Sequence, residues 1–175
     1  MGVSHMSKAE GVGDEDSFAW FFTAEYPHVV RLLSVVLRDR AAAEDVAQEA
    51  FVRLYRHWAK VSRYEAPEAW VRRVALNCAF SVRRREARRV DREAMVDPFG
   101  GSGLRGPDTE RTDIVRAIRK LPPRDRALIG LYHLEDRPVA DVADLLGMRA
   151  GAVKVALHRA RRRLAVLLTE AEVPR

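Results

Sequence analysis

The sequence predicts an all-α protein made of two small helical domains joined by a flexible linker. Aromatic residues make up only 7% of the chain, and Ala, Leu, Val and Arg are plentiful, which favours helices over sheets. Apolar residues recur every three or four positions through most of the sequence. Residues 97–108 hold four glycines and two prolines in twelve positions, a composition typical of a flexible linker. We therefore expect a disordered tail over residues 1–16, domains over 17–95 and 110–170, a linker over 96–109 and a tail over 171–175.

The first domain should begin with two helices within residues 17–38, because Pro27 is expected to end a short helix and start another. Residues 41–58 form a third, with an apolar stripe that includes Tyr55 and Trp58. Its opposite face carries acidic and amide groups on an otherwise basic protein, which makes it a candidate surface for protein contact. The alternative is that Glu49 and Arg53 only form a helical ion pair.

A further helix is expected to begin at Pro67 and run to about residue 90, with Trp70, Val74 and Cys78 facing inward. Asn77, Phe80, Ser81 and Arg84 then share the outer face. An aromatic ring between a carboxamide and arginines suits stacking on unpaired bases, although Phe80 fits a core position equally well. Six arginines fall within residues 83–92, and so dense a cluster of charge favours a polyanionic partner.

In the second domain, a helix over residues 109–120 should stop at Pro122, and Pro123 should begin the next, over residues 124–135. Residues 137–168 then read as a helix-turn-helix, with Gly147 in the left-handed turn. Leu157 belongs to an apolar stripe of the last helix, which turns Lys154 and Arg161 outward. A basic outer face on a packed helix suits the DNA major groove, and the alternative is an ordinary solvated face.

Composition also narrows the class of function. The chain has 31 Lys and Arg against 25 Asp and Glu, a net charge of +6, so nucleic acid is the expected partner. We expect neither membrane insertion nor export, because no apolar run is long enough. A single cysteine, Cys78, fits a buried position in a cytoplasmic protein. The five histidines lack metal spacing and no nucleophile lies beside a base, so no catalytic residue, metal or cofactor is expected.

Three segments together resemble a known family: AEDVAQEAFVRLYRHW, then PEAWVRRVALNCAFSVRRREARR, and, after the linker, LPPRDRALIGLYHLEDRPVADVADLLGMRAGAVKVALHRARRRL. In order and spacing they resemble bacterial RNA polymerase sigma factors of the sigma-70 superfamily, in the small extracytoplasmic-function (ECF) group. The resemblance runs from about residue 18 to residue 168. It implies that the domains are sigma regions 2 and 4.

The resemblance also implies roles for individual residues. The polar face of the helix over residues 41–58 would dock on the beta-prime clamp of the polymerase core, through Asp45, Gln48, Glu49, Val52, Arg53 and Arg56. The helix from Pro67 and the loop before it would open the -10 element and hold a flipped base, through Arg63, Tyr64, Arg73, Asn77, Phe80, Ser81, Arg83, Arg84 and Arg88. The last helix would bind the -35 duplex, through Arg149, Lys154, His158, Arg159, Arg161 and Arg162.

The implied partners are the polymerase core, including its beta subunit, promoter DNA and an anti-sigma factor, with the free protein a monomer or in a 1:1 complex with its inhibitor. The last helix departs from the family, which often carries serine, threonine, serine and arginine where this chain has Arg149, Ala152, Val155 and Ala156. Base recognition should therefore fall on Lys154, His158 and Arg149. Two other classes stay open: a stand-alone helix-turn-helix regulator that binds duplex DNA without polymerase, and a helical adaptor.

Overall fold

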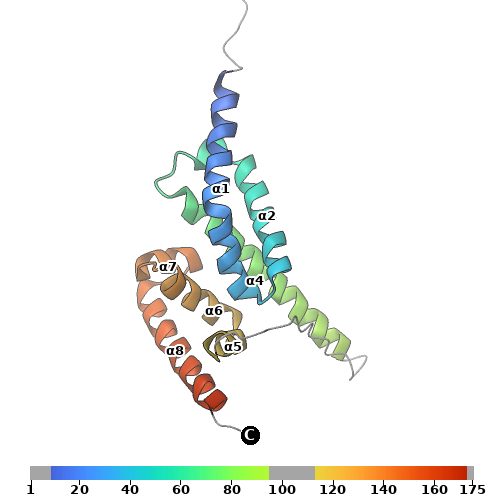
Figure 1. Cartoon of the computed structure of the whole chain (residues 1–175), viewed down its shortest axis with the longest axis vertical. Helices are drawn as coiled ribbons and strands as arrows, with labels where there is room; N and C mark the ends of the chain where they lie inside the picture. Colours follow the sequence, from blue (N-terminus) through green and yellow to red (C-terminus); the bar gives the residue numbers. More distant parts are fainter. Residues whose placement is uncertain (1–8, 95–112, 173–175) are drawn as a thin grey trace, which may run out of the picture.

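The structure is a computed structural model that describes residues 9–94 and 113–172, and these two ranges are helical without a strand. The first domain consists of α1 (Ala9–Leu37), α2 (Arg40–Arg56), α3 (Trp58–Val61) and α4 (Pro67–Ala94). The second consists of α5 (Asp113–Lys120), α6 (Pro123–Ile129), the π-helix η1 (Gly130–Leu134), α7 (Val139–Leu146) and α8 (Ala150–Glu172). The predicted all-α class with two helical domains is confirmed (Figure 1). The predicted linker, residues 96–109, lies outside the described residues.

Helix α1 corrects two predictions. It runs without a break through Pro27, so the expected helix boundary there is wrong. An internal proline costs a helix about 3 kcal/mol or more, but Phe21, Val29 and Leu33, on both sides of it, are buried in the core and offset this cost. Helix α1 also begins at Ala9, so residues 9–16 are helical although we expected a tail there. Residues 1–8 are not described.

The core of the first domain forms between α1, α2 and α4. The Asp39 carboxylate accepts a hydrogen bond of 3.1 Å from the backbone N–H of Ala42, which caps the start of α2. Helix α2 ends at Arg56, two residues earlier than predicted, and Trp58 begins α3. The Trp58 indole N–H donates to Ser17 Oγ at 2.9 Å, which ties α3 to α1. Tyr55, predicted to face inward, is 52% exposed, and its ring forms a T-shaped contact with the ring of Phe18, with 5.0 Å between the centroids.

The second domain follows the predicted order. Helix α6 starts at Pro123, and α7 ends at Leu146 because the next residue, Gly147, has a left-handed backbone (φ 62°). The next N–H, that of Met148, donates to the Ala143 carbonyl at 2.8 Å and closes the turn. Val153, Leu157 and Ala160 of α8 are buried, which confirms the apolar stripe. The helix predicted over residues 124–135 instead changes at Gly130 from α6 into η1.

The two domains pack against each other. Figure 1 shows the second domain beside one end of the α1–α4 bundle, where α6 lies along α1 and α7 along α4. Buried residues of both domains, including Val71, Ala75, Leu128 and Val142, belong to a single apolar core. The sequence left the relative placement of the domains open, and the structure shows a closed arrangement.

Candidate nucleic-acid interface

The polar face of α2 is fully accessible. Its members recur at positions that share one side of a helix, and all are exposed: Asp45, Gln48, Glu49, Val52, Arg53 and Arg56. Glu49 forms an ion pair with Arg53 at 2.5 Å, as the alternative of a simple helical ion pair predicted. Both side chains are about half exposed, so this pair contributes only a few tenths of a kcal/mol to stability. Val52, an exposed apolar side chain at the middle of this set, gives the face an apolar centre with a charged surround.

The outer face of α4 carries the residues predicted to contact single-stranded DNA. Arg73, Asn77 and Arg84 are exposed, and Phe80 and Ser81 are partly buried. Phe80 is half-buried: its ring packs against the core, as the alternative predicted, and lies 5.9 Å from the guanidinium of Arg124 in α6. The structure therefore brings Asn77, Phe80, Ser81 and Arg84 to one side of α4, as the sequence predicted, and Arg73 lies on the same side.

Beyond Ser81, α4 continues with the arginine cluster. Arg84, Arg85 and Arg88 are exposed, whereas Arg83 is partly buried and pairs with Glu86 at 2.6 Å. The side chains of Arg89 and Arg92 are not described. In the connection between α3 and α4, Arg63 and Tyr64 are both exposed. The exposed arginines thus form a cationic surface toward the C-terminal end of α4, while Arg63 and Tyr64 lie before its N-terminal end.

Arg72, next to Arg73, was missed by sequence reasoning. It is buried and forms ion pairs with Glu25 of α1 at 2.7 Å and with Glu135, after η1, at 2.9 Å. Glu135 also accepts from Arg137 at 3.0 Å. No local signal could have identified it, because its partners Glu25 and Glu135 lie far from it in the sequence.

The helix-turn-helix presents a basic outer face on α8. All the predicted members are exposed: Arg149, Lys154, His158, Arg159, Arg161 and Arg162. Arg161 is the member with a partner inside the domain, since it donates to His133 Nε2 at 3.2 Å and stacks over the Tyr132 ring at 5.1 Å. Burial, and secondarily the Arg161 charge, lowers the pKa of His133. This contact ties Arg161 to η1.

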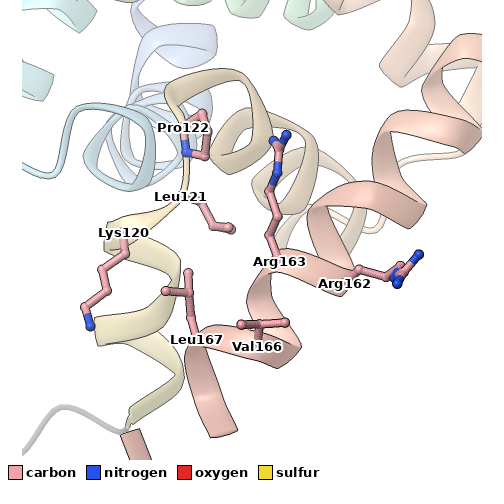
Figure 2. Close-up of a pocket in the computed structure, with 7 residues that line it drawn as sticks. All are labelled: Lys120, Leu121, Pro122, Arg162, Arg163, Val166 and Leu167. Carbon is pink, nitrogen blue, oxygen red and sulfur yellow. The ribbon is translucent and has the colours of Figure 1, made fainter. Parts of the chain in front are cut away.

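A shallow pocket of about 410 Å³ lies between the α5–α6 turn and the end of α8 (Figure 2). Leu121, Val166 and Leu167 form its apolar floor, and Arg163 reaches over one side while pairing with Asp125 at 2.5 Å. Among the lining residues there is no carboxylate, hydroxyl or thiol. The pocket therefore offers mainly apolar contact, with cationic side chains at its edge.

Three further features of the described residues bear on function: the thiol of Cys78, possible metal ligands and possible membrane-spanning helices. Cys78 is buried and burial raises the pKa of its thiol, which makes it a poor nucleophile. Within the described ranges, no three His, Cys, Asp or Glu side chains gather in a way that could hold a metal ion. In the same ranges, none of the helices combines the length and apolar character needed to cross a membrane.

Each of the two domains matches a known protein family. Residues 21–89 match the family described as Sigma-70 region 2, and residues 111–164 match Sigma-70, region 4. The RNA polymerase sigma-E factor of Streptomyces antibioticus is 32% identical over 127 residues, which cover 72% of this chain and 70% of that protein. The ECF RNA polymerase sigma factor SigM of Mycobacterium tuberculosis is 29% identical over 161 residues, 91% of this chain and 81% of that protein.

Solved structures agree on the fold. The sigma factor RpoE from Bartonella quintana, solved with the anti-sigma factor NepR, superposes with a TM-score of 0.68 at 24% identity, over 87% of this chain and 97% of that one. CnrH, solved with the cytosolic domain of CnrY, gives a TM-score of 0.62 at 20% identity and covers 93% of each chain. With a match to region 2 in the first domain, a match to region 4 in the second and these relatives along most of its length, the chain belongs to the sigma-70 family of RNA polymerase sigma factors, in its ECF group.

Proposed function

We propose that this protein binds RNA polymerase core in the cytoplasm and directs it to promoters, where it recognises the -35 element, opens the -10 element and allows transcription to start. It acts by binding and carries out no reaction of its own. The observation that carries this proposal is the separation of two kinds of surface: an acidic and amide face on α2 and cationic faces on α4 and α8. A stand-alone regulator would not need the acidic and amide face on α2. The match to region 2 also does not support a stand-alone regulator.

The α2 face supports contact with the beta-prime clamp. Asp45, Gln48 and Glu49 offer acceptors on one side of a rigid helix whose other side is anchored in the core. Val52 adds an apolar contact that is exposed in the free chain. Charged groups around an apolar centre are the usual anatomy of a specific protein interface.

The α4 and α8 faces support two kinds of DNA contact. Stacking of an unpaired base on an aromatic ring contributes about 1 to 3 kcal/mol, which is comparable to the cost of unpairing it, so Phe80 with Asn77 and nearby arginines can favour the opened strand. On α8, Lys154 and Arg159 supply cations for the phosphates of the duplex. The neighbour RpoE was solved in complex with an anti-sigma factor, and we propose that an anti-sigma factor controls this chain too.

Co-purification with polymerase core tests the proposal. We expect Asp45→Arg and Glu49→Arg to abolish it, because each places a cation where the clamp requires an acceptor. Asp113→Arg, a charge reversal at a similarly exposed acid of α5, is the matched control and should co-purify like the wild type. Circular dichroism checks that all three variants keep their helices. Undiminished binding of the two α2 variants would remove the clamp assignment.

A further inference from the structure

Val155 lies at the centre of the outer face of α8. Its side chain is 51% exposed, although it is apolar. Gly151, one turn earlier, and Arg159, one turn later, share this side of the helix and are exposed too. The outer face is therefore apolar near the start of α8 and cationic farther along. Val153 and Leu157, on the opposite side, are buried and anchor α8 to the domain, so Val155 is kept pointing outward.

The place of Val155 along α8 determines what it meets in a complex with duplex DNA. In a helix-turn-helix, residues near the N-terminus of the second helix contact base edges in the major groove. Val155 lies in the second turn of α8, within this part of the helix. Gly151 and Ala152 before it are too short to hold the helix away from the bases. Lys154 and Arg159 flank it and supply cations for the phosphates, so Val155 faces the bases between them.

The chemistry of a valine side chain selects one base. Valine has no donor or acceptor, so against guanine, cytosine or adenine it leaves polar groups of the base edge without a partner. Thymine instead presents its C5-methyl group in the major groove, and contact between two apolar groups removes both from water. We propose that Val155 selects a thymine of the -35 element through this methyl group. The inference rests on the proposed binding of α8 to that element, and it adds an apolar contact to the hydrogen bonds expected of Lys154 and His158.

Helix α8 offers a matched control for Val155. Val166 belongs to the same helix and is 57% exposed, but it lies beyond Arg162, far from the part of α8 that meets base edges. Val155→Ala and Val166→Ala therefore remove the same two methyl groups from similarly exposed positions. Alanine is a better helix former than valine, so both variants should keep α8 intact. A difference between them in base preference then reports on position alone.

The experiment uses polymerase core reconstituted with the full chain. The start sites of its transcripts define the -35 element, which we expect to contain an invariant thymine. Synthetic promoters then carry deoxyuridine at that position, which lacks only the C5-methyl group, and fluorescence anisotropy at low temperature measures binding while the strands stay paired. We expect wild type to bind the deoxyuridine promoter about fourfold more weakly, the effect of one buried methyl group. Val155→Ala should bind the two promoters about equally, and Val166→Ala should keep the wild-type preference.

A second base substitution separates the methyl group from hydrogen bonding. With 5-methylcytosine in place of the thymine, we expect wild type to bind about fourfold more tightly than with cytosine, and Val155→Ala to show no such gain. A -35 element without thymine, equal binding of thymine and deoxyuridine by wild type, or an unchanged preference in Val155→Ala would overturn the inference. The proposed function fails separately, if core with this protein starts no new transcripts.

Discussion

At the scale of single residues, Arg126 shows how a buried charge is accommodated. Its side chain is 2% exposed and donates to the Val36 carbonyl and to the Leu121 carbonyl. Burial, followed by the nearby charges of Arg38 and Arg83, lowers the pKa of Arg126 to about 10. The group therefore stays protonated at neutral pH, and its hydrogen bonds to main-chain oxygens offset part of the cost of removing it from water.

We expect Arg126→Ala to lower the free energy of unfolding by at least about 2 kcal/mol, because each buried carbonyl that loses its donor costs about 1 to 3 kcal/mol. Urea unfolding followed by circular dichroism measures the change. Arg116→Ala, at an exposed position of α5, should stay within about 0.5 kcal/mol of wild type. Equal stability of the two variants would contradict the role given to Arg126.

The contact between His133 and Arg161 predicts a pH dependence. Because the folded-state pKa of His133 is lowered, its neutral form is favoured, and this contribution is present above the ordinary value of 6.5 and lost as pH falls through the lowered pKa. Arg161→Ala should raise the His133 pKa toward its ordinary value without restoring it fully, since burial is the larger cause. NMR titration of the imidazole C–H signals measures this, and an unchanged pKa would exclude the contact.

The sequence predicted which arginines are exposed on α8 but not that Arg72 and Arg126 are buried. Charge alone favours exposure for every arginine. What buries these two is supplied by other elements, because Glu25 and Glu135 reach Arg72 from α1 and from the end of η1, and the Val36 carbonyl accepts from Arg126. Partners this distant in the chain leave no mark in local periodicity.

At the scale of elements, the turn of the helix-turn-helix depends on backbone conformation more than on space. A Cβ at Gly147 would meet no atom within 4 Å, yet φ is 62° there. We expect Gly147→Ala to destabilise the protein by about 1 kcal/mol, the usual cost of a left-handed backbone for an L-residue. Gly151→Ala, at the second position of α8 and equally open, should stabilise it by up to about 1 kcal/mol, because alanine restricts the unfolded chain. Thermal unfolding of the pair distinguishes the two effects, and a shift of the same sign in both would refute the explanation.

Substitutions in α4 should mainly affect opening of the DNA strands, whereas substitutions in α8 should mainly affect binding to duplex DNA. We expect Asn77→Ala to reduce permanganate reactivity of promoter thymines more than closed-complex formation. Lys154→Ala should instead weaken duplex binding and make its salt dependence shallower, because one phosphate contact is lost. Equal losses at both steps for Asn77→Ala would contradict its role on the opened strand.

Helix boundaries were predictable where local chemistry decides them and wrong where packing does. Pro123 starts α6 and Gly147 ends α7, as their backbone preferences require. Pro27 has an equally strong local preference against a helix interior, but α1 continues through it because both flanking segments are buried against α2 and α4. Tertiary contacts thus override the local signal in the longest helix.

At the scale of the whole molecule, the closed arrangement could not be predicted, because a glycine-rich connection allows compact and extended pairs alike. It is determined by specific contacts between domains, chiefly the shared apolar core and the Arg126 and Arg72 networks. By contrast, the candidate surfaces on α2, α4 and α8 followed from the spacing of residues within each helix, which is why their predicted members were found exposed or partly exposed.

The most direct test of the account is sequencing of the transcripts that purified polymerase core makes on fragmented genomic DNA with and without this protein. We expect new transcripts that start at a limited set of sites, share sequence elements near -35 and -10, and disappear with Asp45→Arg. Identical transcript sets with and without the protein, or duplex binding that core leaves unchanged, would contradict its assignment as a promoter-directing subunit.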